Sequence, residues 1–105
     1  MAHSDTLLIH GIVVENEIEL SLDDLSRACR ADMQQLVALV HEGVLAPAGN
    51  EPPEWRFSGP SLRRARAALR LIHDLQLDPH AVAIVLNLLD EIEALQSRLR
   101  RSGQR

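Results

Sequence analysis

The sequence predicts a mainly α-helical protein that forms one domain over residues 1–105. Three observations support this prediction: apolar residues recur at helical spacing, aromatic side chains are almost absent, and residues 79–101 carry a long apolar repeat. Because Trp55 and Phe57 are the only aromatic residues, the core has to be built from Leu, Val, Ile and Ala. Hydrophobic residues make up 46% of the chain, which is enough for one modest core.

The N-terminal part predicts a small β-strand followed by a helix. Residues 6–14, TLLIHGIVV, are rich in β-branched and aliphatic side chains, which favours a strand. Ser21, followed three residues later by Asp24, resembles a capping box and predicts a helix over residues 21–29. Acidic residues in the first turn of this helix also suit the helix dipole.

A second helix is expected from Asp32, a good N-cap residue, to Glu42, with Gly43 ending it. Its apolar stripe is predicted to comprise Met33, Leu36, Leu39 and Val40. Only two residues, Arg30 and Ala31, separate the two helices, and a connection this short is typical of a helix-turn-helix.

Residues 44–57 contain three prolines and a Gly-Asn pair between apolar ends, and they predict a hairpin or wing. In this wing, "VLA" runs out and "EWRF" runs back, with Trp55 as a core residue between the wing and a helix. The strand, helix-turn-helix and wing together would occupy residues 6–57.

A third helix is expected over residues 60–76, with an apolar stripe of Leu62, Ala65, Leu69 and Ile72. Arg63, Arg66 and Arg70 form a second stripe on the opposite side. These arginines could contact phosphate, but a solvated face with internal salt bridges, such as Arg70 with Asp74, is the favoured interpretation.

The last helix is expected over residues 79–101, with Asp78 as its cap and Pro79 at its first position. A heptad seam runs along it through Ala81, Val85, Leu88, Ile92, Leu95 and Leu99. A second apolar stripe, expected to cover the helix-turn-helix, comprises Val82, Leu86 and Leu89. The seam therefore predicts an antiparallel homodimer whose interface contains Val85, Leu88, Ile92, Leu95 and Leu99.

The charge distribution argues against a dedicated DNA-binding domain. The formal net charge is −4, and all 11 basic residues are arginine. Residues 1–54 hold ten acidic side chains and only two basic ones, whereas residues 55–72 hold five arginines and no acid. DNA affinity comes largely from neutralisation of phosphates, which requires the opposite balance.

The sequence contains no pattern that predicts catalysis, a metal site or a cofactor site. Its five histidines are scattered without ligand spacing, and there is no Gly-rich phosphate loop. Cys29 is expected to be a small core residue. Because it is the single cysteine, no disulfide can form within the chain, which suggests a reducing compartment. With no leader pattern and no apolar run of about 20 residues, we expect a cytoplasmic protein.

The order of these elements resembles the MerR-like winged-helix family. The "EGVLAP" turn and the "WRF" segment are similar to the turn and wing of that family. The resemblance implies a winged helix-turn-helix with small β-strands and a long C-terminal helix that pairs with its mate in a dimer.

Over residues 6–100 the chain more closely resembles one branch, the CbpM-type chaperone modulators. The similarity lies in "LVALVHEGVLAP", "EWRF" and "RRARAALRLIHDLQLDPHAVAIVLNLLDEIEAL". It implies a non-enzymatic protein that binds the J-domain of a DnaJ-like, curved-DNA-binding cochaperone and inhibits its cochaperone and DNA-binding activity. The alternatives are a MerR-type DNA-binding regulator and, less favoured, a structural helical adaptor.

The second helix departs from the DNA-binding members of the wider family. Those proteins carry an arginine and tyrosines that touch phosphates, whereas the matching positions here are Val37, Ala38 and Leu39. The N-terminal half of the chain is acidic, and an acidic surface that includes this helix would suit the basic helix of a J-domain. The candidate partner-binding residues are Asp23, Asp24, Asp32, Gln34, Val37, His41 and Glu42. Helix capping is an alternative explanation for Asp23, Asp24 and Asp32, and Val37 could pack against the wing.

Overall fold

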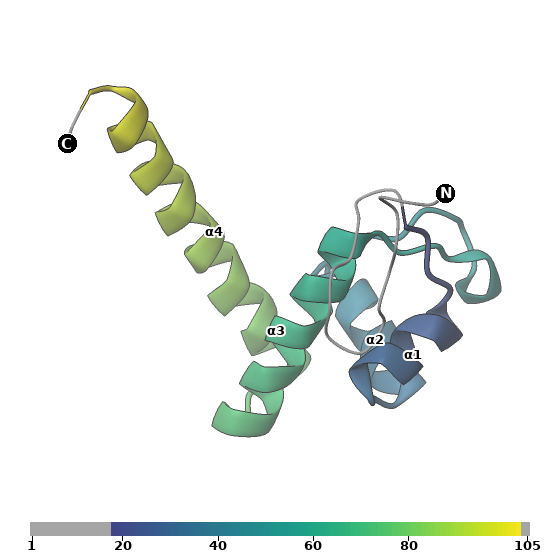
Figure 1. Ribbon diagram of the computed structural model, residues 1–105. Helices are drawn as coiled ribbons and strands as arrows, with labels where there is room; N and C mark the ends of the chain where they lie inside the picture. The colour runs from purple at the N-terminus through teal and green to yellow at the C-terminus, as the bar shows by residue number, and fades with distance from the viewer. Residues whose placement is uncertain (1–17, 104–105) are drawn as a thin grey trace.

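The computed structural model describes residues 18–103, which fold into four α-helices and one short 3₁₀-helix (Figure 1). The helices are α1 (Leu22–Cys29), α2 (Met33–His41), α3 (Gly59–Leu75) and α4 (Pro79–Arg101), and the 3₁₀-helix η1 is Pro52–Glu54. Helix α1 packs on α2 and α3, and α4 packs on α3 and α2. The strand predicted over residues 6–14 lies outside the described residues.

Helix α1 begins with the predicted capping box. The hydroxyl of Ser21 accepts a hydrogen bond from the backbone N–H of Asp24 at 3.0 Å, and the Ser21 N–H donates to the Asp24 carboxylate at 3.2 Å. Arg30 ends the helix in the left-handed conformation, with φ of 55°, and so turns the chain toward α2. The helix-turn-helix expected from the sequence is therefore present.

Helix α2 ends as predicted before Gly43, whose φ of +80° favours glycine. After this turn the Val44 N–H donates to the carbonyl oxygen of Leu39 at 2.9 Å, which closes the end of the helix. Val44 and Leu45 then enter the core.

Residues 44–57, predicted as a hairpin or wing, form a loop without strands, and the two antiparallel bridges here are isolated ones, Leu20 with Phe57 and Ala48 with Arg56. No extended strand forms in residues 18–103. One reason is that η1 contains Pro52 and Pro53, which have no N–H to donate to a ladder. Trp55 is buried, as predicted, and its ring meets that of Phe57 edge-on at a centroid distance of 6.1 Å.

One cluster of buried side chains joins all four helices and the wing. It comprises Leu20, Leu25, Ala28, Leu36, Leu39, Val44, Leu45, Trp55, Phe57, Leu62, Ala65, Ala68, Val82 and Leu86. Met33, predicted as part of the apolar stripe of α2, is 42% exposed, whereas Leu36 and Leu39 of that stripe are fully buried. Met33 is the first residue of α2, where no neighbouring helix covers it.

Helices α3 and α4 lie within a residue of their predicted bounds, and Asp78 caps α4 by accepting the Ala81 N–H at 2.8 Å. The salt bridge predicted between Arg70 and Asp74 does not form. Instead, the Asp74 carboxylate lies 3.2 Å from Nδ1 of His73. No helix within residues 18–103 combines the length and apolar character needed to cross a bilayer.

Helix α4 contacts the other helices through its N-terminal half, as far as the ion pair of Asp90 with Arg64, and then projects away from them (Figure 1). Val82 and Leu86 are buried, as expected of the stripe that covers the helix-turn-helix. Leu89 was predicted to share this role, but it is 51% exposed and lines an open hollow between α3 and α4. From Leu88 onward every large apolar side chain of α4 is exposed.

A matched pair of substitutions in α2 tests this division between core and surface. We expect Leu36→Ala to lower the free energy of unfolding by about 2–5 kcal/mol, because it leaves a cavity in a fully buried position. The control Met33→Ala should cost less than about 1 kcal/mol, because Met33 is exposed. Urea denaturation followed by circular dichroism measures both, and equal losses would contradict the arrangement.

Candidate functional site

The two acidic residues of α1 proposed to face a partner are engaged within their own helix. Arg27 forms ion pairs with Asp23 and, at 2.9 Å, with Asp24. Asp24 also completes the capping box with Ser21. These side chains remain solvent-accessible, but Arg27 offsets part of their charge, so capping accounts for both acids without a partner.

The first turn of α2 presents polar and apolar side chains together. Asp32 is the N-cap residue, and its backbone N–H donates to Oε1 of Gln35 at 3.4 Å. Met33 and Gln34 follow, both exposed. Sequence periodicity assigned Met33 to the apolar stripe of the helix and did not identify it as a surface residue, although its place at the end of the helix was a usable signal.

Farther along α2, Gln34, Val37 and His41 lie on one face, as their spacing of three and four residues requires. Gln34 and His41 are exposed, whereas Val37 is half-buried and packs partly against the core. Val37 is four residues from Met33, so their side chains are neighbours on the helix. The apolar centre of this surface therefore consists of Met33 and the exposed part of Val37.

Glu42 closes the C-terminal end of α2 and contacts another helix. Its Oε1 lies 3.2 Å from Nδ1 of His80 in the first turn of α4. Both side chains remain accessible to solvent. The structure therefore brings Asp32, Met33, Gln34, Val37, His41 and Glu42 together along one helix, which we call the α2 surface, whereas Asp23 and Asp24 lie on α1.

The described residues assemble no group of three or more His, Cys, Asp or Glu side chains suited to a metal ion. His41, His73 and His80 stand on three different helices and are exposed. Cys29 is half-buried. Burial raises the pKa of its thiol, and the nearby Arg66 guanidinium offsets part of this increase.

The second candidate region is the far part of α4. Among the residues predicted to form the seam, Leu88 is 58% exposed, Ile92 is 50% exposed and Val85 is half-buried. Leu95 and Leu99 are also exposed. The four leucine and isoleucine side chains follow heptad spacing, and beyond Asp90 the helix projects away from the rest of the described chain (Figure 1).

Four helices, of which α1 and α2 form a helix-turn-helix, place the described residues in the class of helix-turn-helix proteins. Residues 20–103 match the family model described as "MerR HTH family regulatory protein". The match covers all four helices.

Similar proteins indicate which branch of this family the chain resembles most. The chain is 36% identical over 93 residues to the chaperone modulatory protein CbpM of Coxiella burnetii (strain Dugway 5J108-111). These aligned residues are 89% of this chain and 88% of that protein. It is also 31% identical over 80 residues to CbpM of Pseudomonas putida (strain W619), and this alignment covers 76% of this chain and 79% of that protein. The chain therefore belongs to the CbpM family of chaperone modulatory proteins, within the MerR-like helix-turn-helix proteins.

The environment of Cys29 gives a testable pH dependence. Because burial raises the pKa of the thiol, the reactive thiolate should appear at higher pH than in a free cysteine. Arg66→Gln should move the pH midpoint of alkylation by iodoacetamide higher still, since Arg66 lowers this pKa in the folded protein. Arg70→Gln is the control and should leave the midpoint unchanged. A midpoint at or below that of free cysteine would contradict the prediction.

Proposed function

We propose that this chain is a non-enzymatic chaperone modulator that binds the J-domain of a DnaJ-like, curved-DNA-binding cochaperone. Binding would inhibit the cochaperone activity and the DNA binding of that partner. The observation that carries this proposal is the similarity over most of the chain to proteins named chaperone modulatory protein CbpM. Such a partner also makes the cytoplasm the proposed location.

The α2 surface supports the choice of a protein partner. Helix α2 carries no arginine or lysine, and acidic residues stand at its two ends, Asp32 and Glu42. Asp32 and Glu42 stand ten positions apart, which is about 15 Å along a helix and the length of a short helical segment of a partner. A basic helix could place cations near Asp32 and Glu42 and an apolar side chain on Met33.

The alternative is a DNA-binding transcriptional regulator, which the match to a family of regulatory proteins favours. A recognition helix of this kind needs cations near the phosphate backbone. Here Asp32 and Glu42 would repel phosphates, and Val37 stands where DNA-binding members carry a contacting residue. The α2 surface thus fits a basic protein better than it fits DNA.

Charge reversal at the end of α2 tests the proposed surface. We expect Glu42→Lys to weaken binding to the isolated J-domain about tenfold at low salt, and less at high salt, because ions screen exposed charges. Loss of the exposed pair with His80 should change stability by less than about 1 kcal/mol. Isothermal titration calorimetry at two salt concentrations measures the effect.

Glu51→Lys is the matched control, since Glu51 is exposed, lies in the wing loop and undergoes the same charge change. Equal affinities of the two variants for the J-domain would place the contact elsewhere. A tight, sequence-dependent gel shift of duplex DNA by the wild-type protein would instead support the regulator.

We further propose that two copies form an antiparallel homodimer through Val85, Leu88, Ile92, Leu95 and Leu99. A leucine or isoleucine side chain gains about 1.5–3 kcal/mol when it is fully buried, and two-fold symmetry buries each seam residue on both chains. Parallel pairing would set Arg98 and Arg100 of one chain beside the same arginines of its mate, whereas antiparallel pairing keeps the two basic ends of the helices apart.

One substitution in the seam tests the dimer. Ile92→Asp should give a monomer at micromolar concentration, because it would bury an unpaired carboxylate at the interface. Light scattering measures the mass. Ala94→Asp adds the same charge on the other side of α4 and should leave the dimer intact. A monomeric wild-type protein at the same concentration would contradict the proposal.

A further inference from the structure

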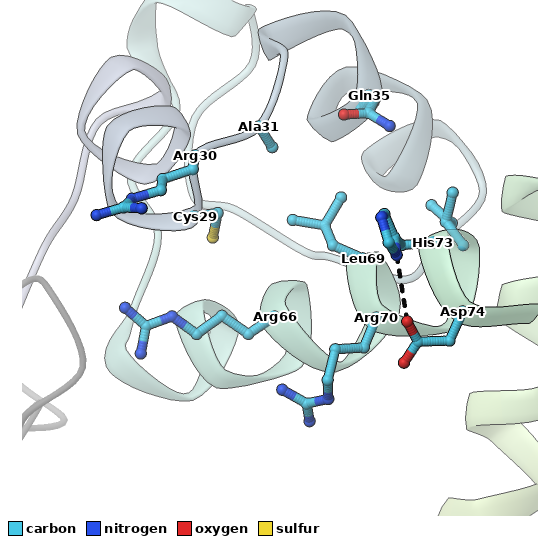
Figure 2. A pocket seen from close by; sticks show the side chains of 10 residues that line it. Cys29, Arg30, Ala31, Gln35, Arg66, Leu69, Arg70, His73 and Asp74 are labelled. Atoms are coloured by element: carbon cyan, nitrogen blue, oxygen red, sulfur yellow. Dashed lines mark hydrogen bonds and ion pairs between the residues drawn. The ribbon is translucent and has the colours of Figure 1, made fainter.

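A pocket of about 430 Å³ lies between the turn that joins α1 to α2 and the C-terminal half of α3 (Figure 2). Its floor is mainly apolar and is built by half-buried side chains, Cys29, Ala31, Leu69 and Ile72. Figure 2 shows Leu69 pointing from α3 into the space below Ala31 and Gln35. The pocket therefore offers an apolar side chain of a ligand a place to lie.

Three arginines from two elements line this pocket: Arg30 from the turn, and Arg66 and Arg70 from α3. Figure 2 shows their guanidinium groups extending outward from the floor in different directions. The guanidinium group of Arg66 donates to the carbonyl oxygen of Ala28 at 3.4 Å, so this side chain is held against the end of α1. The acidic residue that lines the pocket is Asp74, which is paired with His73. A chain with a net charge of −4 thus concentrates three cations around one apolar floor.

We infer that this pocket binds an acidic segment of a protein partner, with the carboxylate of an Asp or Glu side chain held by an arginine at its edge, Arg70 above all, and a neighbouring apolar side chain on the floor. Guanidinium groups offer planar pairs of donors that match a carboxylate. Arg30 and Arg70 are exposed, and the pocket is broad and open, as suits a peptide segment that lies across a surface.

The pocket is continuous with the α2 surface. Gln35 and Ile72 line both the arginine pocket and a second hollow of about 300 Å³, which Asp32 and Gln34 also line. One partner could therefore extend from the acidic end of α2 across Gln35 to the arginines. This inference deepens the proposed function, on which it rests for the assumption that the ligand is a protein.

Opposite charges at the two ends of one surface fix the orientation of a partner. A basic segment alone would be attracted to Asp32 but repelled by the arginine pocket. A partner segment with a basic side chain near α2 and an acidic side chain in the pocket can form both contacts in only one orientation. The pocket thus supplies specificity that a uniformly acidic surface lacks.

The test titrates the ¹⁵N-labelled full chain with the blocked peptide acetyl-Ala-Leu-Glu-Leu-Ala-amide and with its Gln counterpart, and follows amide signals by NMR. We expect the Glu peptide to shift the signals of Arg30, Ala31 and Gln35 and to bind about three- to tenfold more tightly than the Gln peptide. Arg70→Gln should remove most of this difference. Arg63→Gln, on the same helix but outside the pocket, should preserve it.

Equal affinities for the two peptides, or no loss in Arg70→Gln, would overturn the inference. Sodium acetate that shifts the same signals as strongly would indicate a site for a bare anion, and stronger shifts with a short DNA duplex would indicate phosphate binding; either result overturns a peptide ligand. Circular dichroism of each variant establishes that it is folded. Because the assay contains no J-domain, its failure is distinguishable from failure of J-domain binding measured by calorimetry.

Discussion

Helix α4 is attached to the rest of the molecule through its N-terminal half, and the surfaces left for partners depend on this attachment. Val82 and Leu86 bury their side chains against the core. Arg64 adds a polar tie, since its Nε donates to the carbonyl oxygen of Val44 at 2.8 Å and its guanidinium pairs with Asp90 at 3.1 Å. No described residue beyond Leu86 is buried, because a core of this size cannot cover a helix of 23 residues.

Features with a local physical cause could be predicted from the sequence. The bounds of α4 followed from Asp78 and Pro79 at its start, and the capping box of α1 from Ser21 and Asp24. In each case a side chain satisfies backbone groups a few residues away, so neighbours in sequence hold all the information. Gly43 ended α2 for the same kind of reason.

The errors concern contacts between distant elements. Periodicity identifies one face of a helix but does not say how far a neighbouring helix extends over it, which is why Met33 and Leu89 were assigned to covered positions. Arg64 had no local signal, since its partners lie 20 and 26 residues away. The arginine pocket was missed for a similar reason: Arg30 and Arg70 line one cavity only after α1 and α3 pack together.

The same scaffold can serve different partners because a helix-turn-helix fixes the position of its second helix and leaves the chemistry of the exposed side chains open. Contact with phosphates requires cations on that helix. In this chain Asp32 and Glu42 stand at the ends of that helix, and Met33 and Val37 form its apolar centre. The nearby arginines do not lie on the helix but line a pocket beside it. This distribution suits a surface of mixed charge with apolar contacts, such as a protein presents, and opposes the uniform negative charge of a nucleic acid.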